Sequence, residues 1–268
     1  MSEEVFLKHQ AQITPHPKAL EIKEAKGMYI KDIYGNQYLD LVAGVSANTL
    51  GHSHPAVVNA VKSQLEKHMH VMVYGEYIQS PQYQLAKLLA ENLPSSLNCT
   101  YLVNSGCEAI EGAMKLAKRV TRKSEFFSCK NSYHGSSQGA LSLMGTEVYK
   151  TNYRPLLPNC HTIEYNSEKC LQKITEKTAA VVVEPVQGAT GFITPKNNWL
   201  QKLRLRCNEV GALLIFDEIQ TCYGRTGKLF ALETYSVIPD ILCIAKGMGG
   251  GMPLGAFISS KENMDSLK

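Results

Sequence analysis

The sequence has little excess charge of either sign. Its 28 basic and 24 acidic residues leave a net charge of +4, and the basic residues are scattered along the chain, which argues against a nucleic-acid-binding surface. The longest basic cluster, residues 118–123, is better explained as the solvated end of a helix. We therefore expect no DNA or RNA partner.

Several targeting and redox features are also missing. None of the eight cysteines forms a C-x-x-C pair, and a chain of 268 residues is too large to depend on disulfides, so reduced thiols are expected. The first residues lack the basic start and apolar run of a signal peptide. No apolar stretch reaches the length of a membrane span. These absences predict a cytoplasmic protein that does not enter a membrane.

Two nucleotide-binding motifs fail on inspection. The glycines at 247–251 do not complete G-x-G-x-x-G, because the last position of the motif falls on Met252 or Leu254. Lys228 follows a glycine as in a P-loop, but Leu229 stands where that motif needs serine or threonine. Dinucleotide and nucleoside triphosphate binding are therefore disfavoured.

The N-terminal part predicts a small β element followed by a helix. Residues 26–45 contain alternating apolar residues around a Gly-Asn turn, which indicates a hairpin. Apolar residues recur at helical spacing over 57–65, behind Pro55. His52 and His54 have no acidic or cysteine partner nearby in the sequence, so we interpret them as part of a capping turn and predict no metal site.

From about residue 98, short apolar runs rich in β-branched residues alternate with longer amphipathic stretches. This alternation is typical of βαβ units on a parallel sheet. In open α/β sheets, ligands bind just beyond the carboxyl ends of the strands, so the turns after these runs are the first places to search for a site. The runs are residues 100–103, 126–129, 179–183, 212–216 and 241–245.

The first two turns contain candidate ligand-binding residues. Ser105, Gly106 and Cys107 begin an amphipathic stretch, where N–H groups at a helix N-terminus and the serine hydroxyl could receive an anion. Ser-Gly is also an ordinary N-cap sequence. Tyr133 and His134 follow the second run, where a flat ligand could stack, although a tyrosine half-buried under a loop explains the same residues.

The last three runs end in charged residues. Glu184 follows one run and Asp217 ends the next; a buried carboxylate needs a partner, and Asp217 could cap a helix or pair with Arg225. Lys246 ends the last run, and four of the five residues at 247–251 are glycine. Burial lowers the pKa of a lysine and leaves an amine suited to Schiff-base formation, while a lysine that extends out of a loop is the alternative.

Together these turns meet the separate needs of pyridoxal phosphate. A helix end suits the phosphate, an aromatic ring stacks on the cofactor, an acid holds the protonated pyridine nitrogen, and a lysine forms the Schiff base and moves protons. The order of these features along one α/β chain favours this cofactor.

From about Lys18 to its end, the sequence resembles the class III aminotransferases of fold type I, especially the acetylornithine and ornithine aminotransferases. The resemblance implies an α/β fold, in which residues 51–268 form the cofactor-binding large domain with a mainly parallel sheet and flanking helices. Residues 1–50 are then part of the small domain. The resemblance is most specific at residues 215–221 (IFDEIQT), 224–231 (GRTGKLFA), 239–241 (PDI) and 245–246 (AK).

The resemblance also implies a role for each candidate residue. Lys246 forms the internal aldimine, and Asp217 pairs with the pyridine nitrogen. Glu184, in a Glu-Pro-x-Gln-Gly sequence, faces the substrate. The remaining cofactor-binding residues are Ser105, Gly106 and Cys107 at the phosphate, Tyr133 stacked on the ring with His134 beside it, and Gln220 near the ring hydroxyl.

Two departures limit the substrate assignment. Cys107 stands where relatives usually have threonine, serine or alanine, which removes a hydroxyl contact to phosphate. Ala189 stands where acetylornithine, ornithine and aminobutyrate enzymes have a glutamate after Gln-Gly. We therefore predict only the reaction class, a ping-pong transfer of an amino group from an amino-acid donor to a keto acid by a homodimer. A class III decarboxylase, racemase or aminomutase is the alternative.

A further departure is length. The chain ends at Lys268, 22 residues after Lys246, whereas the relatives continue well past the lysine. We interpret the sequence as truncated, with the C-terminal small domain absent. A non-catalytic fragment that keeps the cofactor-binding residues is therefore a second alternative.

Overall fold

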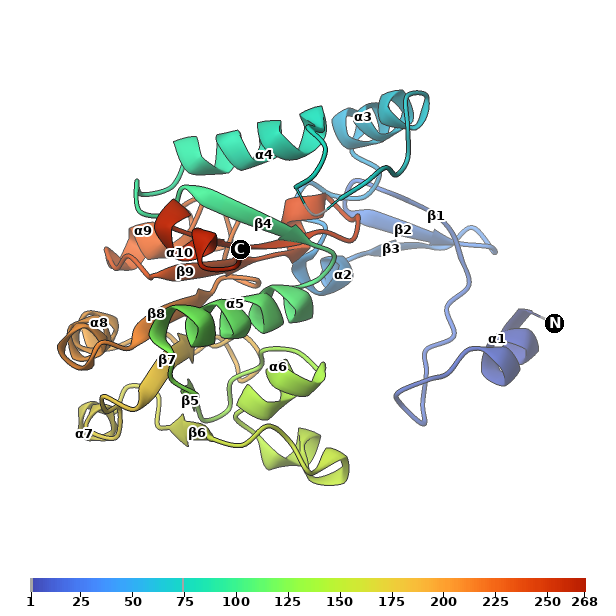
Figure 1. Ribbon diagram of the computed structural model, residues 1–268. Helices are drawn as coiled ribbons and strands as arrows, with labels where there is room; N and C mark the ends of the chain where they lie inside the picture. Colours follow the sequence, from blue (N-terminus) through green and yellow to red (C-terminus); the bar gives the residue numbers. More distant parts are fainter. Residues whose placement is uncertain (1, 74) are drawn as a thin grey trace. The chain divides into compact units, whose positions relative to one another are not determined.

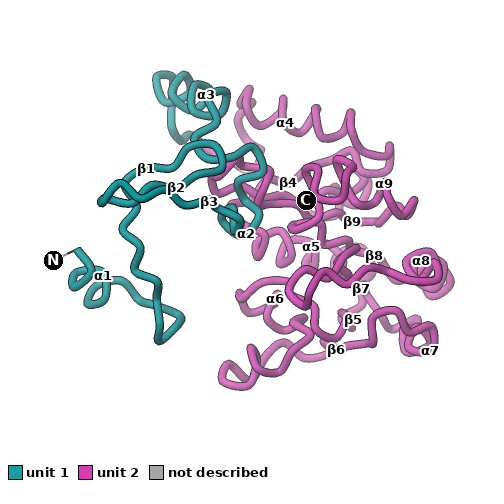
Figure 2. The backbone as a smooth tube through the Cα atoms, turned by 180° about the vertical axis from the view of Figure 1, so that it is seen from behind, with its two compact units in different colours: residues 1–71 teal, residues 72–268 magenta. Residues whose placement is uncertain are grey.

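The computed structural model describes residues 2–73 and 75–268. The chain forms two compact units, residues 1–71 and residues 72–268 (Figure 2). The predicted boundary between residues 50 and 51 separates small-domain from large-domain sequence, and it stays a prediction.

In the first unit, the predicted hairpin is part of an antiparallel sheet with the strand order β1-β2-β3. The buried carboxylate of Asp32 organises the turn between β2 and β3, because its Oδ1 accepts hydrogen bonds from the N–H groups of Tyr34 (3.0 Å) and Asn36 (2.8 Å). Gly35 completes this turn with a φ of +89°, which favours glycine. The elements are α1 (Ser2–His9), β1 (Ile22–Lys26), β2 (Tyr29–Asp32), β3 (Gln37–Leu39), α2 (Ala43–Ser46) and α3 (Pro55–Leu65).

The two histidines before α3 behave differently. His54 caps the helix as predicted, since its Nδ1 accepts a hydrogen bond from Ala56 N at 3.3 Å. His52 has the acidic partner that the sequence analysis did not find: its Nε2 lies 2.7 Å from Asp40 Oδ2. The two residues meet because the chain returns after β3 and the main chains of Gly27 and His52 pair. Among the residues that the structure describes, no three His, Cys, Asp or Glu side chains are grouped to hold a metal.

The second unit is built on a seven-stranded sheet with the order β4-β10-β9-β8-β7-β5-β6 (Figure 1). Strand β10 runs antiparallel to both of its neighbours, while the other neighbouring pairs are parallel. The predicted α/β fold with a mainly parallel sheet is therefore confirmed. The strands are β4 (Cys99–Val103), β5 (Glu125–Cys129), β6 (Cys160–Ile163), β7 (Thr178–Val183), β8 (Leu213–Asp217), β9 (Ile241–Ile244) and β10 (Gly255–Ser259).

Helices cover both faces of this sheet. Alternate residues of the central strands point to opposite faces. Val181 and Val183 belong to a buried cluster with residues of α4, α8 and α9, whereas Ala180 and Val182 belong to one with residues of α5 and α6. Among the described residues, no helix combines the length and apolar character that crossing a membrane requires. The helices are α4 (Ser80–Glu91), α5 (Gly106–Thr121), α6 (Gln138–Leu143), α7 (Glu168–Leu171), α8 (Trp199–Val210), α9 (Ala231–Tyr235) and α10 (Lys261–Asp265), with the 3-10 helices η1 (Glu147–Tyr149), η2 (Thr151–Tyr153) and η3 (Lys246–Gly249).

Helix α5 approaches β10 closely at Gly112. A Cβ atom on Gly112 would lie 2.3 Å from Cε1 of Phe257, and this ring is buried and stacked on Tyr101 with 4.9 Å between centroids. The glycine thus allows the helix to rest against the ring.

We expect Gly112→Ala to lower the free energy of unfolding by about 1–3 kcal/mol, because the added methyl group forces Phe257 or α5 to move. Helix propensity alone predicts the opposite sign, a gain of about 1 kcal/mol. Urea unfolding checks the sign. Lys115→Ala, at an exposed position of the same helix, should change stability by no more than about 0.5 kcal/mol, and an unchanged or raised unfolding midpoint for Gly112→Ala would contradict the steric explanation.

Candidate active site

The candidate residues of the second unit follow the carboxyl ends of its parallel strands. Tyr133 and His134 follow β5, Glu184 follows β7, Asp217 ends β8, and Lys246 follows β9. Strands β5 and β7 are neighbours, and the chain proceeds outward from them in opposite directions, to β6 on one side and to β8 and β9 on the other. Such a switch in strand order opens a crevice at the carboxyl edge of the sheet, where ligands bind.

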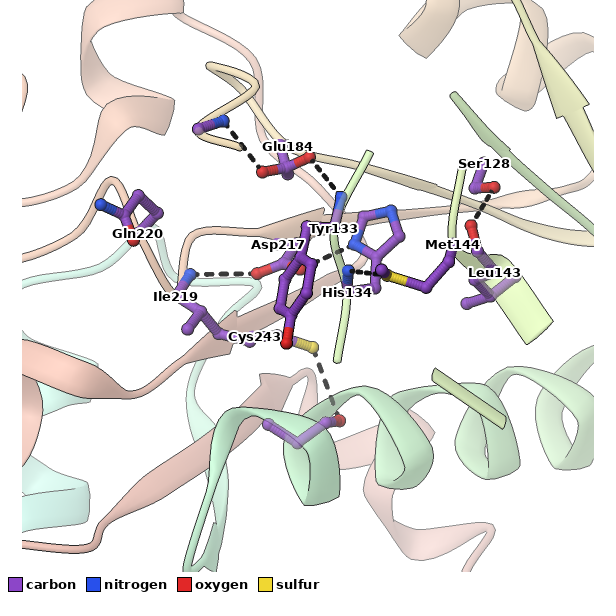
Figure 3. Close-up of polar contacts among 12 residues, drawn as sticks. Ser128, Tyr133, His134, Leu143, Met144, Glu184, Asp217, Ile219, Gln220 and Cys243 are labelled. Carbon is purple, nitrogen blue, oxygen red and sulfur yellow. Dashed lines mark hydrogen bonds and ion pairs between the residues drawn. The ribbon is translucent and has the colours of Figure 1, made fainter. Parts of the chain in front are cut away.

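A buried ion pair spans this edge. His134 and Asp217 point toward each other in Figure 3, with 2.7 Å between Nδ1 and Oδ2, and their side chains are 0% and 4% exposed. Burial disfavours the charged ring, but the hydrogen bond and the charge of Asp217 outweigh it and raise the pKa of His134. The sequence alone suggested that Asp217 caps a helix or pairs with Arg225. The fold supplies a different buried partner, an imidazole from 83 residues away.

Asp217 and the turn that follows it are held by further hydrogen bonds. Asp217 Oδ1 accepts one from Ile219 N at 3.1 Å, so both carboxylate oxygens have partners within the protein. On the other side of the pair, His134 N donates to the sulfur of Met144 at 3.3 Å (Figure 3). The position of the carboxylate is therefore fixed from two sides.

Glu184 is also buried, and its carboxylate is turned toward main-chain groups. Oε2 accepts a hydrogen bond from Tyr133 N and Oε1 accepts one from Gly188 N, both at 3.1 Å (Figure 3). Burial raises the pKa of Glu184, and the nearby charge of Asp217 acts in the same direction, whereas His134 opposes it. Glu184 thus connects the turn after β5 to the turn after β7, and its predicted contact with substrate stays a prediction.

Lys246 lies half-buried at the start of η3, with a left-handed φ of +47°. Its Nζ donates a hydrogen bond to Oε1 of Gln220. Burial lowers the pKa of Lys246, and Arg225 acts in the same direction, while the carboxylates of Asp217 and Glu184 oppose it. A lysine with a lowered pKa releases its proton more readily and then acts as a nucleophile.

The N-terminus of α5 forms another part of the edge. Ser105 is its N-cap, as the sequence suggested, and Oγ accepts a hydrogen bond from Glu108 N at 3.2 Å. Gly106 allows the turn after β8 to pack against this helix end, since a Cβ atom there would lie 2.8 Å from Cδ1 of Ile219. The first N–H groups of an α-helix have no acceptor within the helix, so Gly106 and Cys107 provide the donors that suit an anion.

Tyr133 is 45% exposed, which leaves part of its ring available to a ligand. The ring of Tyr149 meets it edge-on, with 6.3 Å between centroids and an interplanar angle of 89°. This contact is favourable for two aromatic rings. It comes from η1, which the sequence analysis did not connect with the site.

Glu218, next to Asp217, has a structural role that the sequence analysis missed. It is fully buried, and its two carboxylate oxygens accept hydrogen bonds from Ala231 N (2.6 Å) and Leu232 N (2.7 Å) at the start of α9. Burial raises the pKa of Glu218 to about 7, although these hydrogen bonds oppose the shift. The adjacent carboxylates therefore have different roles. Asp217 lies with the candidate site residues, whereas Glu218 holds the start of α9.

Comparisons with known proteins identify the family of the chain. The family model for class III aminotransferases matches residues 11–268. The acetylornithine aminotransferase of Methanopyrus kandleri is 44% identical over 91% of this chain and 62% of its own length. That of Clostridium acetobutylicum is 42% identical, over 91% and 63%. The chain thus spans about three fifths of the length of these relatives.

Solved structures show the same fold at lower sequence identity. An ornithine aminotransferase from Toxoplasma gondii is 32% identical with a TM-score of 0.90, covering 99% of this chain and 65% of its own. An amine transaminase from an uncultivated Pseudomonas species, in its PLP-bound form, is 30% identical with a TM-score of 0.88, covering 97% and 66%. These similarities confirm the predicted family and its fold.

The buried carboxyl of Glu218 predicts a pH dependence of stability. Its pKa rises from an ordinary value of 4.5 to about 7 in the folded chain, so the folded state binds this proton more tightly. The resulting stability is fully present below pH 4.5 and is lost as the pH rises through 7. Between pH 5 and 8 we expect the free energy of unfolding of the parent to fall, relative to Glu218→Gln, by on the order of 2 kcal/mol.

Urea unfolding at several pH values measures this difference. Glu209→Gln is the matched control, because the side chain of Glu209 is 63% exposed and forms an ion pair with Arg206 at the surface. It should follow the parent at each pH. Parallel pH profiles for the parent and Glu218→Gln would show that Glu218 does not take up the proton.

Proposed function

This chain belongs to the class III aminotransferase family, and we propose that it provides the cofactor-binding part of an enzyme that transfers an amino group from an amino-acid donor to a keto acid. In this proposal residues 51–268 are the large domain and residues 1–50 belong to the small domain. The observation that carries it is the position of Lys246 and the buried Asp217–His134 pair at one edge of the sheet. The similar proteins are named as aminotransferases of acetylornithine, ornithine and putrescine, which favours transfer over decarboxylation, racemisation or a mutase reaction.

The residues at this edge fit pyridoxal 5'-phosphate. The cofactor needs an amine for covalent attachment, an anion-binding helix end for its phosphate and an acid for its ring nitrogen. The amine of Lys246, the N-terminus of α5 and the carboxylate of Asp217 supply these groups. When bound, the cofactor supplies an electron sink for the negative charge that develops on the carbon bearing the amino group.

Lys246 and Asp217 have the main chemical roles in this proposal. Lys246 holds the cofactor and then accepts and returns a proton at Nζ, which its lowered pKa favours. Asp217 would accept a hydrogen bond from the protonated ring nitrogen of the cofactor. His134 keeps that carboxylate oriented, because its raised pKa favours the imidazolium form that donates to Oδ2.

The other candidate residues bind and orient. The half-exposed ring of Tyr133 would stack on the flat face of the cofactor. Gln220, whose Oε1 accepts a hydrogen bond from Lys246, would bind the hydroxyl side of the cofactor ring. The phosphate would be received at the helix end by Ser105, Gly106 and Cys107.

The donor and the acceptor are assigned only as an amino acid and a keto acid. Ala189 lies exposed in the turn after Gly188, and it brings no carboxylate to a position where the sequence resemblance implies a glutamate. Glu184 is the remaining acid near this turn and is the residue that we place closest to the substrate.

We also propose a homodimer in the cytoplasm. Leu41, Val42 and Val45 are exposed in the first unit, with relative exposures of 86%, 67% and 64%, and an association that covers them would be favourable. All eight cysteines are free, which suits a reducing compartment.

The visible spectrum of the purified chain with pyridoxal phosphate tests the cofactor assignment. The parent should become yellow, and borohydride should then attach the cofactor irreversibly to Lys246, as mass spectrometry of the peptides would show. Lys246→Ala should show neither effect, because it lacks the amine. Equal spectra for the two proteins, or attachment at another lysine, would refute the role of Lys246.

A single-turnover experiment tests the reaction class. Amino acids are mixed with the cofactor-loaded protein without an acceptor, and the released product is identified. Transfer predicts one keto acid for each bound cofactor, at a rate that Lys246→Ala lowers by at least about a hundredfold because the proton carrier is gone. Carbon dioxide or an inverted amino acid without keto acid would favour the decarboxylase or racemase alternative.

A further inference from the structure

Two residues one turn apart on α5 contact the turn that carries Tyr133 and His134. Cys107 Sγ accepts a hydrogen bond from Ser136 N at 3.4 Å. One turn further along, Glu111 meets the start of α6. The helix whose N-terminus suits the phosphate therefore also holds the segment that presents the aromatic ring.

The contact made by Glu111 is concentrated on one oxygen atom. Its Oε1 accepts hydrogen bonds from Ser137 Oγ (2.7 Å), Gly139 N (2.6 Å) and Ala140 N (3.1 Å). These N–H groups belong to the first turn of α6, where they have no acceptor within the helix. Hydrogen bonds to a carboxylate are stronger than those between neutral groups, so this one side chain fixes both the end of the turn and the start of the helix.

A glycine occupies each of the two contacts. A Cβ atom on Gly139 would lie 2.2 Å from Oε2 of Glu111, and one on Gly135 would lie 2.4 Å from Sγ of Cys107. Gly135 also has a φ of +123°, which favours glycine. The turn at Gly135 and the start of α6 at Gly139 thus both approach α5 closely.

We propose that Glu111 is a positioning residue that fixes the Tyr133–Ser137 turn relative to the N-terminus of α5. The proposal deepens the proposed function and rests on it, because it concerns the separation between the phosphate donors and the stacking ring. Glu111 is not one of the residues proposed above to contact the cofactor. It acts through Ser137, Gly139 and Ala140, and through them it also holds His134 against Asp217.

Two substitutions of Glu111 separate its hydrogen bonds from its bulk and charge. Glu111→Gln keeps a carbonyl oxygen that can accept the same three hydrogen bonds, whereas Glu111→Leu has a side chain of similar size without an acceptor. We expect the leucine variant to raise the dissociation constant of pyridoxal phosphate at least about tenfold and to change the visible circular dichroism of the bound cofactor, which reports the orientation of its ring. The glutamine variant should stay within about threefold of the parent with an unchanged spectrum.

Hydrogen exchange without cofactor tests the same contact independently of binding. The amide protons of Gly139 and Ala140 should exchange at least about tenfold faster in Glu111→Leu, while those of Glu111→Gln stay near the parent rate. If the parent binds no pyridoxal phosphate, the proposed function fails, and the exchange rates still decide the role of Glu111. Unchanged exchange in Glu111→Leu would overturn the proposal, and so would unchanged binding and dichroism.

Controls distinguish positioning from general destabilisation. Ser137→Ala removes one of the three donors and should give a smaller effect in the same direction, and it serves as the test variant if Glu111→Leu does not fold. Glu209→Leu makes the same replacement on the exposed surface of α8 and should leave binding, dichroism and exchange unchanged. An equal change in Glu209→Leu would show that the effect is not specific to Glu111 and would overturn the proposal.

Discussion

The arrangement of the candidate site depends on the buried contact between His134 and Asp217. Two ionisable groups that are almost completely removed from water must satisfy each other, and loss of either partner leaves an uncompensated group in the interior. The contact joins the turn after β5 to the end of β8, while β7 lies between these strands in the sheet. The pair therefore requires the register of β5, β7 and β8 to be correct, and it fixes how the turns beyond these strands are placed.

The remaining charges at this edge are tuned by the same burial. Desolvation raises the pKa of Glu184 and lowers that of Lys246, so each group moves toward its neutral form. Among the nearby charges, Asp217 contributes most to favouring the imidazolium of His134 and to opposing the loss of the proton from Lys246, and Glu184 acts in the same direction on both. The carboxylate of Asp217 thus affects the pKa of His134, which orients it, and the pKa of Lys246, the proposed nucleophile.

Local patterns in the sequence were sufficient for the strands that carry the site. The predicted runs at 100–103, 126–129, 179–183, 212–216 and 241–245 match β4, β5, β7, β8 and β9. In β5, β7, β8 and β9 the match follows from burial, because buried parallel strands are continuous apolar runs. The short edge strand β6 and the antiparallel β10 were not predicted: β6 is only partly buried, and β10 begins directly after a glycine-rich segment. Partners distant in sequence were also missed, since no local pattern indicates that His134 meets Asp217, or that Asp40 meets His52.

The same distinction explains why the roles of the acidic residues could not be ranked from the sequence. Glu184, Asp217 and Glu218 all follow apolar strands, but their roles depend on which main-chain groups they reach in the fold. Glu218 meets the first amides of α9, Glu184 joins two turns, and Asp217 faces an imidazole. Because unpaired N–H groups occur at every helix start, a carboxylate that reaches one has a structural use. A carboxylate whose buried partner is another ionisable group is a better candidate for a role in catalysis or cofactor binding. At this edge of the sheet that residue is Asp217.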